Sequence, residues 1–140
     1  MKNQVAEKIF ENFWKDKNLD AINHAEKRKA IKEVYSNIDT YFKRYSNSEN
    51  KLEFFQYSLP YIGEIGKYHL ARNLGFNMAK PDRHLMKISN YFGFNDVQEF
   101  YKFVSEDTKD EIIVIDYVFW RFANLNLNYI DNIERIILNS

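Results

Sequence analysis

All four glycines and both prolines of this 140-residue chain lie between Pro60 and Gly93. Glycine permits backbone conformations that other residues avoid, and proline interrupts a helix, so together they mark the places where a chain turns. The rest of the sequence contains neither residue, which favours uninterrupted helices there. The sequence therefore predicts one irregular region inside a helical protein, and we expect the functional residues in that region.

The composition fits one folded domain over residues 1–140. Apolar residues make up 45% of the chain, which is enough for a single sizeable core. The chain has no cysteine, so a disulfide, a thiolate nucleophile, an iron–sulfur cluster and cysteine-ligated zinc are excluded. The N-terminus opens into an amphipathic pattern without a long apolar run, which predicts a cytoplasmic protein with neither a signal peptide nor a membrane span.

Charge and histidine spacing narrow the kinds of site that the chain can carry. Twenty basic and twenty acidic side chains cancel, so the protein does not attract phosphate in bulk and any nucleic-acid site must be local. His24, His69 and His84 are scattered, without the spacing or the neighbouring carboxylates of a metal site. We therefore expect no metal.

Hydrophobic spacing predicts an all-α fold of about seven or eight short helices, with no strand pattern. We expect helices over residues 4–16, 20–44 with a break near Ser36, 52–59, 64–74, 82–93, 95–104, 112–122 and from about 128. Arg44–Asn50 is polar and is expected to form a loop.

Helix ends are predicted from capping residues. Gly75 and Gly93 stand where a left-handed residue closes a helix. Asn95, with Gln98 three residues later, is expected to open one helix. Thr108 and Glu111 are expected to form a capping box at the start of the helix over residues 112–122.

A helix-hairpin-helix is expected at about residues 52–75. The first helix ends before the turn Pro60-Tyr61-Ile62-Gly63, and the second begins at Glu64. The N–H groups in the first turn of the second helix would face outward, and such a turn is a natural cradle for a phosphate or a bound cation. Lys67 would add positive charge. The alternative is an ordinary connection between two helices.

Asp82 stands directly after Pro81, nineteen residues beyond Gly63. This position is typical of an N-cap, where a carboxylate accepts hydrogen bonds from the first turn of the next helix. Taken alone, Asp82 is most simply structural.

The combination of these features resembles the endonuclease III-like, helix-hairpin-helix superfamily of DNA glycosylases. The residues that carry the likeness are the hairpin, the closing Arg72-Asn73-Leu74-Gly75-Phe76 and the aspartate that opens the next helix. Asp82-Arg83-His84-Leu85 is most similar to the archaeal and bacterial oxidised-guanine branch. The likeness covers about Leu52 to Phe92 and continues weakly in residues 115–121.

The resemblance implies a role in base excision repair, with duplex DNA that carries a modified base as the partner. It implies catalysis by Asp82 and contacts to the DNA backbone from hairpin residues. These contact residues are Tyr61, Ile62, Gly63, Glu64, Gly66 and Lys67. It implies no cofactor beyond a monovalent cation that the hairpin would hold, and a location at the nucleoid.

Two positions depart from the family pattern. Tyr61 stands where the first of the two hairpin glycines is usual, and Ile65 stands where bifunctional members carry a lysine. Without that lysine no amine attacks the sugar, so the resemblance implies a monofunctional enzyme whose product is an abasic site. Ile65, Arg83 and His84 are the pocket candidates, and Ile65 is expected to be buried and to face Asp82.

Two alternatives stay open. A non-catalytic helix-hairpin-helix module would bind DNA while Asp82 only caps its helix, and the short chain, the neutral charge and Ile65 favour it. A helical protein-interaction domain would instead use exposed aromatic side chains. The target base, the opposite base and the oligomeric state are not specified by the sequence.

Overall fold

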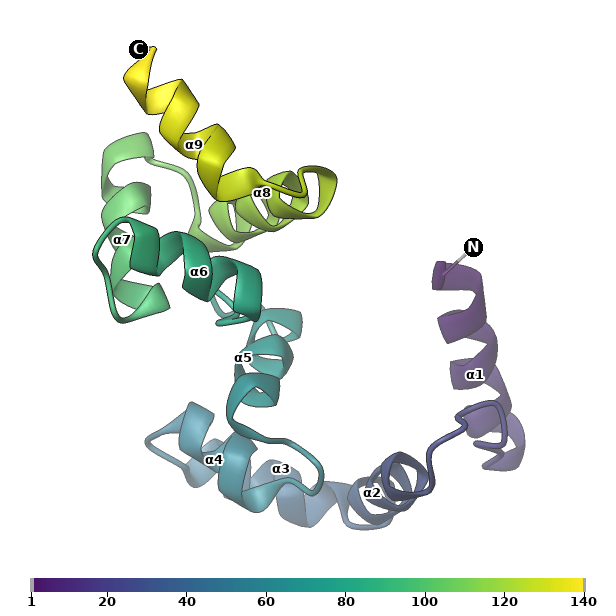
Figure 1. Cartoon of the computed structure of the whole chain (residues 1–140). Helices are drawn as coiled ribbons and strands as arrows, with labels where there is room; N and C mark the ends of the chain where they lie inside the picture. Colours follow the sequence, from purple (N-terminus) through teal and green to yellow (C-terminus); the bar gives the residue numbers. More distant parts are fainter. Residues whose placement is uncertain (1, 140) are drawn as a thin grey trace. The chain divides into compact units, whose positions relative to one another are not determined.

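Hydrophobic side chains recur every three or four residues along most of the chain, and helices form over these runs. The computed structural model describes residues 2–139, without the side chains of residues 2–6 and Phe10. Over that range the fold is all-α, as predicted, with nine helices and no strand (Figure 1). The helices are α1 (Lys2–Asp16), α2 (Ala25–Ser36), α3 (Ile38–Asn47), α4 (Lys51–Ser58), α5 (Glu64–Asn73), α6 (Arg83–Tyr91), α7 (Val97–Thr108), α8 (Ile112–Leu125) and α9 (Tyr129–Leu138).

The run over residues 20–44 forms two helices. The total number of helices in the described range is therefore larger than the predicted seven or eight. The helices α2 and α3 meet at Asn37, next to the predicted break. Residues 20–24 are not helical, because the Asp20 N–H donates to Asn18 Oδ1 (2.7 Å) in a local turn. The predicted loop over Arg44–Asn50 is wrong in its first part, since α3 continues to Asn47.

Two of the predicted caps are wrong. Asp96, rather than Asn95, opens α7, and its Oδ1 accepts from the Gln98 N–H (2.8 Å). Thr108 ends α7 instead of opening α8, and Glu111 makes no side-chain capping bond. In place of a capping box, the first turn of α8 donates from the Ile113 N–H to Asn77 Oδ1 (3.2 Å), far away in the sequence.

The chain divides into two units, one ending at Ile62 and the other beginning at Gly63. The first unit buries Phe13, Leu19, Ala30, Phe54 and Phe55. In it the rings of Phe55 and Tyr45 are stacked, with their centroids 5.6 Å apart. The prediction of one domain over residues 1–140 stays a prediction.

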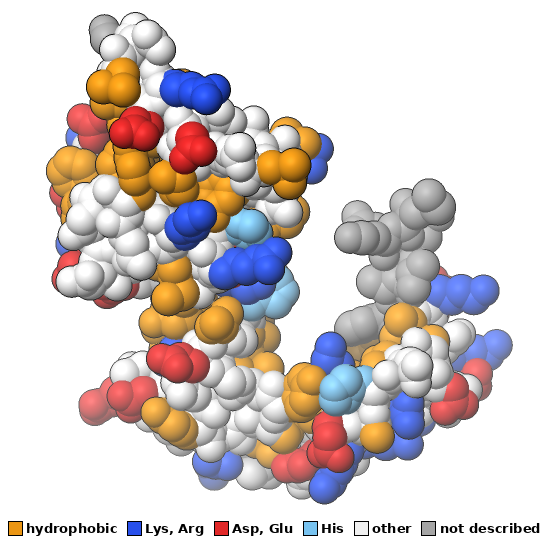
Figure 2. All heavy atoms as spheres, viewed as in Figure 1, with side chains coloured by type: hydrophobic (Ala, Val, Ile, Leu, Met, Phe, Trp, Pro, Cys, Tyr) orange, Lys and Arg blue, Asp and Glu red, His pale blue; other side chains and the backbone are white. Residues whose placement is uncertain are grey.

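The second unit is built around a cluster from α6, α7, α8 and α9. Leu85, Ile88 and Tyr101 are completely buried in it, and Ala79 joins them from the segment between α5 and α6. Hydrophobic side chains also reach the surface over this unit (orange in Figure 2). None of the helices in the described range has the length and apolar character needed to cross a membrane.

Candidate functional site

The predicted backbone contacts fall on both sides of the boundary between the two units. Tyr61 and Ile62 end the first unit, and Gly63, Glu64, Gly66 and Lys67 begin the second. Tyr61 has a φ of 65°, the left-handed region that favours glycine. The backbone at Tyr61 is therefore of the kind a glycine would adopt, although the residue is a tyrosine.

The Tyr61 side chain is anchored to the start of α2. Its hydroxyl lies 3.1 Å from His24 Nε2, and the two ring centroids are 5.3 Å apart. His24 is the N-cap of α2, with Nδ1 accepting from the Lys27 N–H (3.4 Å). An accepting Nδ1 places the proton of the neutral ring on Nε2, so His24 donates to the Tyr61 oxygen. Tyr61 is thus fixed to the start of α2, within the first unit.

Gly63 opens α5 without a side-chain cap. Its φ of −91° is open to any residue, and a Cβ added there would meet no atom within 4 Å. Neither the backbone conformation nor packing within the chain requires glycine at this position. The absence of a long or charged side chain at this position leaves the first N–H groups of α5 accessible.

Asp82 is the N-cap of α6, as predicted. Its Oδ1 accepts from the N–H groups of His84 (2.9 Å) and Leu85 (3.1 Å). The half-buried carboxylate makes no bond through Oδ2 to any described residue. One oxygen therefore holds the helix while the other can accept a proton or face a ligand, so a capping role and a chemical role are compatible.

Arg83 and His84 extend this site along the first turn of α6. Arg83 Nε donates to His84 Nε2 (3.3 Å), which leaves the neutral ring protonated at Nδ1. His84 Nδ1 lies 3.3 Å from the hydroxyl of Tyr129, and burial raises the pKa of that hydroxyl. The structure therefore places Asp82, Arg83 and His84 together at one end of α6.

Ile65 does not lie where the sequence prediction put it. Its side chain is 46% exposed, so the expectation of a buried residue is wrong. The reason is that α5 buries only Ala71, near its C-terminal end, and its first turn lies at the surface. A lysine at position 65 would be solvated, and burial would not lower its pKa.

Side chains from α7 and α8 hold the segment between α5 and α6, which sequence reasoning missed. The Lys80 N–H donates to Asp116 Oδ2 (2.7 Å). Gln98 binds both backbone groups of Ala79, accepting from its N–H (3.0 Å) and donating to its carbonyl (2.6 Å). These bonds lie two and three residues before Asp82, so they fix the backbone that leads into the N-cap.

Asp116 is itself a buried carboxylate, 3% exposed. It pairs with Arg72 through Nη1 (2.8 Å) as well as with the Lys80 N–H. Burial raises the pKa of Asp116, and this effect outweighs the opposite influence of the Lys80 N–H and Arg72. The sequence did contain a signal, because Asp116 is the one charged residue between Ile112 and Trp120.

A buried phenol lies near both carboxylates. Tyr101 is completely buried, and its hydroxyl has no hydrogen-bond partner among the described residues. Burial raises the pKa of Tyr101, and the negative charges of Asp116 and Asp82 raise it further. The core of the second unit therefore contains the buried Tyr101 hydroxyl and the Asp116 carboxylate, which pairs with Arg72, in addition to the buried Ser89.

Gln98→Ala is expected to lower the free energy of unfolding by about 2–4 kcal/mol, because each buried backbone group left without a partner costs about 1–3 kcal/mol. Ala79 is fully buried, so water cannot replace the lost bonds without opening the core. Gln98→Glu keeps an acceptor for the Ala79 N–H but loses the donor to the Ala79 carbonyl. Its free energy of unfolding should therefore lie between those of wild type and Gln98→Ala. Urea unfolding measures all three, and an alanine variant as stable as wild type would contradict the assigned role.

No group of three or more histidine or carboxylate side chains within residues 2–139 is placed to hold a metal ion. Comparison of the chain with protein-family models, with curated proteins and with solved structures gave no match.

Proposed function

We propose that the protein is a monofunctional DNA glycosylase, which hydrolyses the N-glycosidic bond of a damaged or modified base. The observation that supports this most is the Asp82 carboxylate, whose Oδ1 is held by two helix N–H groups while its Oδ2 bonds no described residue. A carboxylate fixed through one oxygen presents the other in a defined direction, which is the arrangement that a preorganised catalytic group needs.

The chemistry follows from the charge of that group. Cleavage of an N-glycosidic bond builds positive charge on the sugar, so a carboxylate stabilises the transition state more than the ground state. The free oxygen of Asp82 can also orient or deprotonate the attacking water. The target base would be flipped out of the duplex to reach Asp82, and without a lysine at position 65 the product is an abasic site.

The hairpin supplies the DNA contact in this proposal. Gly63 leaves the first N–H groups of α5 open, and Lys67 lies in the first turn of the same helix. With a neutral chain and one hairpin, only a few phosphates are contacted, so duplex binding should weaken slowly with salt.

The test uses the wild-type chain and duplexes that carry uracil, hypoxanthine, alkylated adenine or oxidised guanine, followed by alkali to cleave abasic sites. We expect release of at least one of these bases, and gel shifts that Gly63→Glu weakens and Gly63→Ala leaves unchanged. Gly63→Ala is a matched control because the site has room for a Cβ. Binding without release of any base would favour the non-catalytic module, and no binding at low salt would leave the protein-interaction domain.

A further inference from the structure

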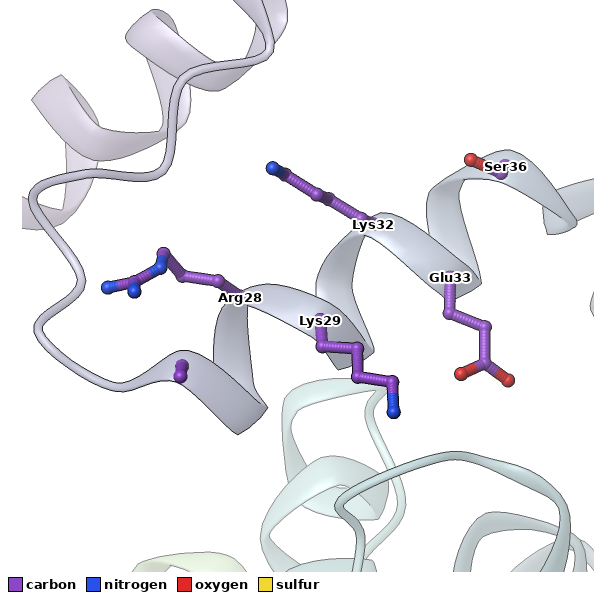
Figure 3. Close-up of a pocket in the computed structure, with 6 residues that line it drawn as sticks. Arg28, Lys29, Lys32, Glu33 and Ser36 are labelled. Carbon is purple, nitrogen blue, oxygen red and sulfur yellow. The ribbon is translucent and has the colours of Figure 1, made fainter.

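A groove with mostly basic walls runs along α2 in the first unit (Figure 3). Arg28 and Lys32 extend on one side of it and Lys29 and Glu33 on the other, with a volume of about 510 Å³ between them. Within each side the two residues are four positions apart, one helical turn, so the two rows run side by side along α2. Small residues, Ala25 and Ser36, complete the lining.

Among the described residues, no carboxylate forms an ion pair with the basic side chains of this groove. The side chains of Lys29 and Lys32 form no hydrogen bond or ion pair with any described residue. Arg28 uses Nη1 to donate to the Ile22 carbonyl (2.6 Å), which fixes the guanidinium. The other N–H groups of the guanidinium bond no described residue and can donate to a ligand. The one carboxylate, Glu33, accepts from the Tyr41 hydroxyl (3.0 Å).

The groove begins beside the hairpin turn. Its first lining residue, Ala25, follows His24, and His24 is the residue to which the Tyr61 hydroxyl is bonded. Lys27 Nζ also lies 5.8 Å from the centre of the Tyr61 ring. Contacts within the first unit thus hold Tyr61 next to the start of α2, where the groove begins.

We propose that α2 binds a second stretch of the DNA backbone, with Lys29 and Lys32 contacting phosphates. This inference rests on the proposed DNA-binding function and extends it from the hairpin to a separate helix. Lysine ammonium groups suit the phosphodiester backbone because they pair with phosphate as point charges, without reading the base sequence. A local contact of this kind is what a chain of zero net charge requires.

The test is the salt dependence of duplex binding by Lys29→Gln/Lys32→Gln. Each phosphate contact adds about 0.9 to the slope of log K against log salt, so losing two should reduce the slope by about 1.8. The control, Lys43→Gln/Lys102→Gln, loses the same charge from exposed positions on α3 and α7 and should keep the wild-type slope.

Acetylation of lysine amines, read by mass spectrometry, gives a second measurement on the unmodified sequence. Bound duplex should protect Lys29 and Lys32 but not Lys43 or Lys102. If wild type binds, Gly63→Glu weakens binding and the α2 double variant keeps the wild-type slope, the inference is wrong and the hairpin proposal stands. If wild type does not bind duplex DNA at low salt, both are wrong.

Discussion

Asp82→Asn is expected to reduce base release by about a hundredfold or more while the protein stays folded. An asparagine oxygen accepts from the His84 and Leu85 N–H groups as an aspartate oxygen does, so the cap of α6 is kept. The neutral amide cannot stabilise positive charge on the sugar or take a proton from water, and a positioned acid or base contributes about 10²–10⁴-fold. Single-turnover release from the preferred duplex measures the effect.

Asp96→Asn is the matched control for this variant. Asp96 caps α7 by accepting from the Gln98 N–H, and no catalytic role is assigned to it. Both variants should unfold at nearly the same urea concentration as wild type, and only Asp82→Asn should lose turnover. Equal turnover in the two variants would show that Asp82 is only a cap.

Asp116→Ala is expected to destabilise the second unit by about 3–5 kcal/mol, the usual cost of removing one partner from a buried ion pair. The change leaves the Arg72 guanidinium without its counterion and the Lys80 N–H without its acceptor. Urea unfolding followed by circular dichroism measures the total decrease in the free energy of unfolding. Hydrogen exchange should show the loss of protection in residues 63–139, and undiminished protection there would contradict the assignment.

Asp116→Asn separates the hydrogen bond from the charge. Its amide oxygen can still accept from the Lys80 N–H, so the loss of stability should be smaller than with alanine. Burial raises the pKa of Asp116 above its ordinary value of 3.8. At pH values between 3.8 and the raised pKa, the folded state therefore binds the proton more tightly than the unfolded state does. Asp116 therefore makes wild-type stability fall as the pH rises from about 3.8 through the raised pKa.

The asparagine variant lacks this titration, while the other carboxylates titrate in both proteins. The stability of wild type relative to Asp116→Asn should therefore decrease as the pH rises through that range. An increase would mean that the Arg72 pair and the Lys80 hydrogen bond outweigh burial, which is the opposite of the assigned direction.

Local features of this fold could be predicted from the sequence. Asp82 caps α6 by accepting from N–H groups only two and three residues away. Gly75 and Gly93 both have the positive φ that is typical of the residue closing a helix. Such interactions depend on spacing within one or two turns, which the sequence shows directly.

Long-range features of the candidate site could not be predicted in the same way. Lys80 and Asp116 are 36 residues apart, and Ala79 and Gln98 are 19 apart, so only the packing of α7 and α8 brings them together. The absence of the predicted capping box has a similar cause, because the Ile113 N–H donates to the side chain of the distant Asn77 rather than to that of Thr108. The exposure of Ile65 likewise depends on which face of α5 is covered.

The segment from Asn77 to Asp82 has consequences for how the chain can vary in length. Connections without regular structure are usually where insertions and deletions are tolerated. In this connection side chains of α7 and α8 hold Ala79 and Lys80, and Asn77 in turn caps α8, so its spacing is fixed at three points. One added residue before Asp82 would shift the carboxylate by up to about 3.8 Å, the distance between successive Cα atoms. Related chains that keep the site are therefore expected to vary in the composition of this connection but not in its length.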